Sequence, residues 1–259
     1  MYRNQGPQPL LKQRIQRKTA TRRSLLTLAL QGGNADARSL LRALRKARLT
    51  AGPGFAADLE AMRREREADE RPFTEMMPHV GSSPTLGHHA RVASCPPATC
   101  RLLYHLAADR RARRCIEMGS AVGISGAYLA RAVAGSGHVV TLEGNPQSAG
   151  AARDTFRSLA LDNIELVEGM FDDTLTEVLQ RQAPVDFLFI DGHKSGEAMQ
   201  RYFEGALPYL APRALVVMDD IRWNEGMAAA WSRIRRAHPF TLCAELFGMG
   251  FLVPGDAGS

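Results

Sequence analysis

The sequence predicts an α/β fold in which a mostly parallel sheet is covered by helices on both faces. From residue 97 onward, short apolar runs alternate with amphipathic segments of helical length. This order is typical of parallel strands joined by helical crossovers. The expected strands are residues 115–119, 138–144, 164–169, 185–192 and 214–220. The expected helices are residues 123–134, 146–160, 173–182, 195–210 and 224–238.

The last two apolar runs predict a different strand connection. Residues 240–247 ("FTLCAELF") and 249–254 ("MGFLVP") are separated by little more than Gly248. A connection this short cannot hold a crossover helix, so the two runs are expected to pair in antiparallel fashion. With the five strands before them they make a sheet of seven strands.

Before residue 97 the pattern is helical. Apolar spacing predicts helices at residues 8–31, 35–49 and 55–70. The third contains "EAMRREREADE" and is expected to be mostly solvated. We therefore expect a helical, basic N-terminal extension with a loop over residues 1–96, and one domain over residues 97–259.

The end of this extension is predicted to be a long loop. Residues 71–98 are rich in Pro, Gly, Ser and His, and loops of this length are often functional or mobile. We expect His88 and His89 to be exposed in it, the alternative being that they line a pocket for a substrate. A helix begun by proline follows, in "PPATCRLLYHLAADRRARR".

The positive charge of the chain is concentrated near its N-terminus. The net charge is +6, but residues 1–72 carry 16 Lys and Arg against 7 Asp and Glu, whereas the rest carries 17 against 20. Such an arm could bind the phosphates of RNA or an acidic partner. It could also bind a second copy of the chain, which would give a homodimer through the N-terminal helices. The slightly acidic body, with no aromatic-studded basic face, argues against nucleic acid.

Composition also bears on the compartment. No run reaches the ~20 apolar residues that a membrane span needs, so no membrane is expected. Residues 24–30 are at the lower length limit for a signal peptide and lack a clean cleavage site. Four cysteines without a C-x-x-C pair favour free thiols in a reducing compartment. We therefore expect a cytoplasmic protein.

An acidic residue ends or follows each of the five expected parallel strands. Ligands bind where the carboxyl ends of such strands meet the loops. Any one of these acids alone would more often cap a helix, but five at one rim indicate a ligand site. They are Glu117, Glu143, Asp172 with Asp173, Asp191, and Asp219 with Asp220.

The glycines after the first strand are spaced for a ligand other than a dinucleotide. The dinucleotide fingerprint is G-x-G-x-x-G, whereas here Gly119 and Gly123 have no glycine two residues after the first. Glu117 is also a poor neighbour for a pyrophosphate. S-adenosylmethionine suits the rim better, because it carries a sulfonium, an ammonium and a ribose diol. Glu143 is placed to accept hydrogen bonds from that diol.

These residues carry a family resemblance. "IEMGSAVGISGAYLA" resembles the first motif of class I S-adenosylmethionine-dependent methyltransferases, in the form found in the catechol O-methyltransferase-like branch. "VVTLEGNP" resembles the second motif, and "VDFLFIDGHK" with "ALVVMDDIRW" resembles the fourth and fifth strands. The match covers residues 97–253. It implies a Rossmann-like, doubly wound, mostly parallel seven-stranded sheet with an antiparallel last strand.

The resemblance also implies how S-adenosylmethionine would be held. Each of its parts would be bordered by residues after a different strand. The methionine and ribose part would contact Glu117, Met118, Gly119, Ser120, Gly123 and Ser125; the ribose hydroxyls Glu143 and Gly144; the adenine Gly169, Met170 and Phe171; and the methyl donor Asp191.

Catechol-type enzymes hold a divalent ion on an Asp after strand four and an Asp-Asn pair after strand five. The matching residues are Asp191, Asp219 and Asp220, with an Asp in place of the family's Asn. Neighbouring parallel strands lie ~4.8 Å apart, so the three carboxylates could meet at one ion. Because all the ligand atoms would be oxygens, Mg²⁺ or Ca²⁺ would be favoured. The alternative is that Asp219 caps the following turn, Asp220 bonds backbone, and no ion binds.

Two residues are candidates for the base that deprotonates the acceptor. Lys194 keeps the D-x-x-K spacing from Asp191 of the catechol-type enzymes, in which that lysine is the base. His193 needs no lowered pKa to act near neutral pH. Either one could instead be a solvated loop residue.

The resemblance implies an S-adenosylmethionine-dependent methyltransferase that methylates the hydroxyl of a small molecule, with or without a metal. Two alternatives stay open. One is a methyltransferase acting on RNA or on an amine nitrogen, and the other is a non-catalytic binding protein. The intact rim of acids argues against the last.

Overall fold

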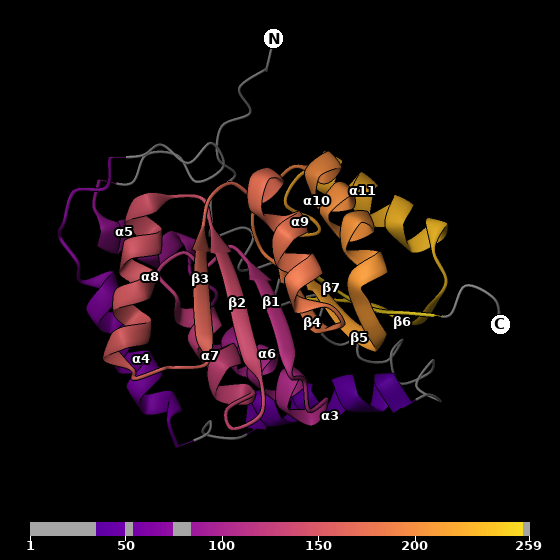
Figure 1. The fold of residues 1–259 in the computed structure, drawn as a ribbon, viewed down its shortest axis with the longest axis horizontal. Helices are drawn as coiled ribbons and strands as arrows, with labels where there is room; N and C mark the ends of the chain where they lie inside the picture. The colour runs from indigo at the N-terminus through magenta and orange to yellow at the C-terminus, as the bar shows by residue number, and fades with distance from the viewer. Residues whose placement is uncertain (1–34, 50–53, 75–83, 256–259) are drawn as a thin grey trace, which may run out of the picture.

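A computed structural model describes residues 35–49, 54–74 and 84–255 (Figure 1). The described residues form one seven-stranded sheet in the order β3-β2-β1-β4-β5-β7-β6. The strands β1 to β5 are parallel, and β7 runs antiparallel to both of its neighbours. The strand bounds are β1 Arg114–Met118, β2 His138–Glu143, β3 Ile164–Glu168, β4 Val185–Ile190, β5 Leu210–Met218, β6 Phe240–Leu246 and β7 Met249–Pro254. The predicted fold class is confirmed, including the antiparallel last strand.

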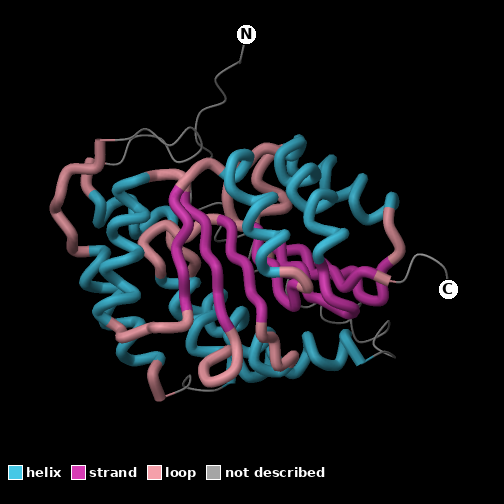
Figure 2. Tube along the Cα trace, in the orientation of Figure 1, coloured by secondary structure: helices cyan, strands magenta, loops and turns pink. Residues whose placement is uncertain are grey.

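Helices cover both faces of the sheet, which forms the central layer in Figure 2. One hydrophobic core joins β1 side chains such as Ile116 to helices α9, α10 and α11, and a second core joins Cys115 to the helices of the opposite face. The helices predicted from residue 97 onward are confirmed. Their bounds are α6 Pro97–Asp109, α7 Ile124–Ala132, α8 Pro146–Ser158, α9 Phe171–Gln182, α10 Gly196–Ala206 and α11 Glu225–Ala237, with a 3₁₀ turn η1 Leu207–Tyr209.

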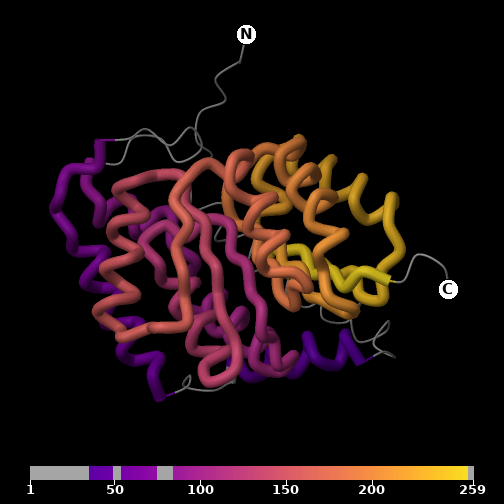
Figure 3. Tube along the Cα trace, in the orientation of Figure 1, coloured from indigo at the N-terminus to yellow at the C-terminus, as the bar shows by residue number. Residues whose placement is uncertain are grey.

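Two of the three predicted N-terminal helices fall in the described residues. They are α3 Ala35–Leu49 and α4 Ala56–Glu67, and the helix predicted at residues 8–31 lies outside the described part. Figure 3 shows both indigo helices on the side of the molecule away from α9 to α11. Leu40 and Leu59 belong to the same core as α6 and α7. The division at residue 97 stays a prediction.

The prediction of a solvated α4 was wrong for part of its charged surface. Arg63 and Arg66 are buried there, with Leu59 and Met62. The Arg63 guanidinium donates to Glu60 at 2.9 Å and contacts the Cys100 sulfur at 3.4 Å. Long basic side chains can bury their aliphatic stems against a neighbour when the head finds polar partners, and a charge count does not reveal such partners.

Arg66 connects α4 to the loop after β1. Its Nε donates to the Thr155 hydroxyl at 3.0 Å, which in turn donates to the Val122 carbonyl at 2.8 Å. We expect Arg66→Ala to lower the free energy of unfolding by about 2 kcal/mol, since the bond comes from a charged, buried donor. Urea unfolding would measure it. Arg64→Ala, on the exposed side of α4, is the control, and equal losses in both variants would contradict the expectation.

The prediction of an unbroken loop over residues 71–98 was wrong in its second half. Helix α5 spans Leu86–Ala93, and Thr85 caps it by accepting from the His88 N–H at 3.1 Å. His89 is buried, stacks on Phe73 with ring centroids 4.3 Å apart, and lies 3.1 Å from the Ser148 hydroxyl. The expectation that His89 is exposed was therefore wrong as well. Residues 75–83 lie outside the described part.

Among the helices in the described part of the chain, none is both long enough and apolar enough to cross a bilayer.

Candidate active site

The backbone ladder of the sheet continues one residue beyond the strand ends and aligns the predicted rim. Gly119 N–H donates to the Leu142 carbonyl, and Asp191 N–H donates to the Met118 carbonyl, each at 2.9 Å. Asp219 N–H donates to the Ile190 carbonyl, and Gly169 N–H donates to the Glu143 carbonyl, again at 2.9 Å each. The residues that follow β3, β1, β4 and β5 are thus each held in register with the strand beside them, with β2 lying between β3 and β1.

The glycine loop after β1 leaves no space for a side chain at either of its two glycines. Gly119 has φ +99°, and a Cβ there would lie 2.2 Å from the Asp191 carbonyl oxygen. Gly123 has φ +88° and a Cβ there would lie 2.9 Å from Phe156, so the loop sits directly on α8. Ser120 is buried, and its hydroxyl has no hydrogen-bond partner among the described residues. Met118 is fully buried in the core under α9 to α11.

Glu143 holds the glycine loop through backbone hydrogen bonds. Its Oε2 accepts from Ala121 N–H at 2.8 Å and its Oε1 from Asn145 N–H at 2.9 Å. Burial raises the pKa of the carboxyl, and the backbone donors partly offset that rise. Each carboxylate oxygen has two lone pairs, so Glu143 can accept further hydrogen bonds. It lies at the end of β2, where the sequence predicts it.

Glu117 is the most deeply buried acid of the rim. Its Oε2 accepts from the Thr141 hydroxyl at 2.7 Å, and its Oε1 has no hydrogen-bond partner among the described residues. Burial raises the pKa of this carboxyl to about 7, against the lowering effect of hydrogen bonds from Ser125 and Thr141. A cationic ligand beside Glu117 would favour its ionised form.

The residues after β3 form an apolar border between two strand ends. A Cβ at Gly144 would lie 3.1 Å from the Met170 sulfur, and a Cβ at Gly192 would lie 2.5 Å from the Phe171 ring. Met170 is 60% exposed, unusual for a large apolar side chain in this molecule. Gly169, with φ +149°, makes the turn into this segment. An exposed thioether beside an aromatic edge suits a flat ring such as adenine.

Lys194 lies between two of the acids predicted to bind metal. Its Nζ is 2.6 Å from Asp191 Oδ1 and 3.0 Å from Asp220 Oδ2. Burial alone would lower the pKa of Lys194, but the carboxylates of Asp191, Asp220 and Asp219 outweigh burial and raise it well above its ordinary value. In this arrangement Lys194 keeps its proton. His193 is exposed, and its Nδ1 lies 3.0 Å from the Tyr202 hydroxyl.

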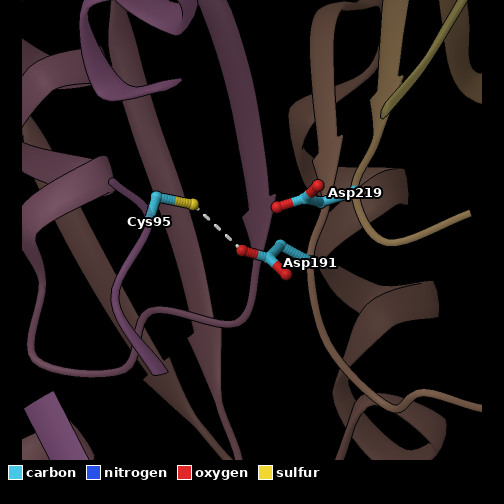
Figure 4. A group of neighbouring side chains, drawn as sticks. All are labelled: Cys95, Asp191 and Asp219. Atoms are coloured by element: carbon cyan, nitrogen blue, oxygen red, sulfur yellow. Dashed lines mark hydrogen bonds between the residues drawn. The ribbon is translucent and has the colours of Figure 1, made fainter. Parts of the chain in front are cut away.

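A cysteine joins two of the predicted metal ligands, as Figure 4 shows. Donor atoms of Cys95, Asp191 and Asp219 all lie within 4.8 Å of one another. The Cys95 thiol donates to Asp191 Oδ2 at 3.1 Å, and burial, with Asp191 next, raises the pKa of the thiol. Asp220 is not in this group, because its carboxylate faces Lys194. These donors would fit a divalent cation of borderline softness.

Sequence reasoning did not identify Cys95. It lies between α5 and α6, 96 residues before Asp191, within the segment expected to be a loop. No motif or periodicity in the sequence pairs it with β4. In the sequence, Cys95 stands out only as one of two cysteines near the start of the helix begun by Pro97.

Known methyltransferases are similar to this chain in sequence. Residues 116–221 match the model of a methyltransferase domain family. Catechol O-methyltransferase from Mycobacterium tuberculosis is 34% identical over 130 residues, which are 50% of this chain and 57% of that relative. A catechol O-methyltransferase from Niastella koreensis is 30% identical over 130 residues, covering 49% and 58%. The chain thus spans somewhat more than half the length of these relatives.

Solved structures share the fold. The crystal structure of an O-methyltransferase from Bacillus cereus in complex with SAH superposes with a TM-score of 0.58 over 81% of this chain and 94% of that one, at 21% identity. Residues 116–221 thus resemble a methyltransferase domain, and the sheet that contains them has the fold of this O-methyltransferase. Over the aligned 130 residues the chain is similar to catechol O-methyltransferases.

Proposed function

We propose that this chain transfers a methyl group from S-adenosylmethionine to a hydroxyl of a small molecule. The observation that carries the proposal is the alignment of Gly119, Asp191, Asp219 and Gly169 at the strand ends, where the backbone ladder of the sheet continues to each of them. The catechol O-methyltransferase relatives support the reaction class.

Different residues at the strand ends would bind different parts of S-adenosylmethionine. Glu143 would accept the ribose hydroxyls, with Gly144 leaving room beside it. The loop over residues 119–123, with Glu117 and Ser125 beneath it, would hold the methionine part. Met170 and Phe171 would border the adenine. The bound cofactor supplies a methyl group activated by its sulfonium, and placing acceptor and donor together would provide much of the acceleration.

The proton of the acceptor would go to His193 or Lys194. With Asp191 and Asp220 both on its ammonium, Lys194 would stabilise the developing oxyanion as a cation, and His193 would accept the proton. A divalent cation beside these carboxylates would lower the pKa of Lys194 through like charge, and would also lower the pKa of a bound hydroxyl. Asp191, Asp219 and Cys95 are the residues that would hold it.

The proposal extends to the compartment of the protein and to its oligomeric state. A reducing compartment such as the cytoplasm is supported by the four cysteines, all of which are free. A homodimer through the N-terminal helices remains a proposal based on the basic arm, most of which lies outside the described residues.

Turnover of labelled S-adenosylmethionine tests the reaction class. We expect methyl transfer to phenolic or catecholic hydroxyls in a panel that also contains amines and an RNA. Transfer only to the amines or to RNA would replace the hydroxyl acceptor by one of those classes. Cofactor binding without transfer to any acceptor would identify a binding protein and contradict the proposal.

Glu143→Ala is expected to weaken the binding of S-adenosylmethionine by at least about tenfold, because charge-assisted hydrogen bonds are worth roughly 1.5–3 kcal/mol. Isothermal titration calorimetry measures this loss. Glu168→Ala is the matched control, since Glu168 lies beside Glu143 at the end of β3 but is exposed and pairs with Arg153. Unchanged affinity in Glu143→Ala would remove this residue from the cofactor site.

A further inference from the structure

The thiol of Cys95 occupies an unusual place for a structural cysteine. It is 5% exposed and directed at the carboxyl ends of β4 and β5 rather than into the apolar core alone (Figure 4). Its sulfur lies within 4.8 Å of donor oxygens from both Asp191 and Asp219. Two carboxylates and a sulfur from three separate segments therefore converge on one point.

The two oxygens of Asp191 face different partners. Oδ1 accepts from Lys194 at 2.6 Å, whereas Oδ2 accepts from Cys95 at 3.1 Å. A cation bound on the Oδ2 side would therefore leave the contacts of Lys194 with Asp191 and Asp220 in place. This end of the sheet carries the carboxylates of Asp191, Asp219 and Asp220 against the one ammonium of Lys194, so a divalent cation between Asp191 and Asp219 would compensate negative charge.

We propose that Cys95 provides a thiolate ligand to a divalent cation held with Asp191 and Asp219, and that the site thereby selects a thiophilic ion such as Zn²⁺ or Co²⁺ over Mg²⁺. On binding, a sulfur–metal bond forms, the S–H bond breaks and its proton passes to solvent; no electrons are transferred. Carboxylate and water ligands suit Mg²⁺, whereas thiolates favour softer ions. The inference rests on the proposed use of this rim by a methyltransferase, but not on the acceptor.

Absorption spectroscopy with Co²⁺ alone tests the sulfur ligand. We expect the chain of 259 residues to develop a near-ultraviolet thiolate-to-cobalt charge-transfer band that saturates at one equivalent. The band should be lost in Cys95→Ser and retained in Cys100→Ser, a second buried cysteine five residues further on, which contacts Arg63. A wild-type chain that binds Co²⁺ without the band, or a band that survives in Cys95→Ser, would overturn the proposal.

Competition between ions tests the selectivity. We expect Cys95→Ser to weaken Zn²⁺ binding by about tenfold or more, with little change for Mg²⁺. Calorimetry with S-adenosylmethionine verifies that the variant is folded, since Cys95 is not among the residues proposed to bind it. Absence of any Co²⁺ or Zn²⁺ binding overturns the metal inference, whereas methyl transfer that persists in EDTA leaves the proposed function standing.

Discussion

Gly119→Ala is expected to lower the free energy of unfolding by at least about 3 kcal/mol and to abolish binding of S-adenosylmethionine. Backbone strain at a positive φ costs on the order of 1–3 kcal/mol, and Gly119 has φ +99°. The added Cβ would also lie 2.2 Å from the carbonyl oxygen of Asp191, so the ends of β1 and β4 would have to separate. Urea unfolding and calorimetry with S-adenosylhomocysteine measure the two effects.

Gly150→Ala provides the matched control. Gly150 lies in α8, and a Cβ there meets nothing within 4 Å. Alanine should stabilise that helix by about 0.5–1 kcal/mol. If Gly119→Ala unfolded at the wild-type urea concentration, the close contact between the glycine loop and Asp191 would be refuted.

Glu117→Gln is expected to remove a pH dependence of stability. Burial raises the pKa of Glu117 to about 7, from an ordinary value of 4.5. Between these values the folded state binds the proton more tightly than the unfolded state, so wild-type stability falls as the pH rises from about 4.5 to about 7. The loss amounts to roughly 3 kcal/mol at 1.36 kcal/mol per unit, and the glutamine variant should lack it.

Chemical denaturation at pH 5 and pH 8, without ligand, measures the difference. For each protein, the free energy of unfolding at pH 8 is compared with that at pH 5. Any loss of stability that the glutamine causes equally at both pH values cancels in this difference. Glu168→Gln, which removes an exposed carboxylate at the end of β3, is the control. Equal pH dependence in wild type and Glu117→Gln would show that this carboxyl ionises as an ordinary one.

The rim of the site was predictable because it depends on local sequence. Apolar runs mark the strands, and the residue after each parallel strand lies at one edge whatever the details of packing. Glu143, Asp191 and Asp219 could therefore be placed from the sequence. The spacing from Asp191 singled out Lys194 as a candidate base, but their contact is seen only in the structure, where His193 between them has φ +50°.

The remaining features depend on contacts between distant segments. Asp220 faces Lys194 rather than the group around Cys95 because the chain turns there at φ +55°, and strand spacing alone does not specify that turn. The buried Arg66 donates a hydrogen bond to Thr155, which lies 89 residues further along the chain. Helix α5 is eight residues long, too short for its apolar periodicity to stand out from the surrounding Pro and Gly.

The hydrogen bond between Cys95 and Asp191 bears on the order in which this site can assemble during synthesis of the chain. The two residues are 96 positions apart, and Asp219 is added later still. A growing chain would therefore have made the segment carrying Cys95 well before either carboxylate exists. The three donors can meet only after β4 and β5 have joined the sheet. Ion capture would thus be among the last events of maturation, and incomplete chains would lack it.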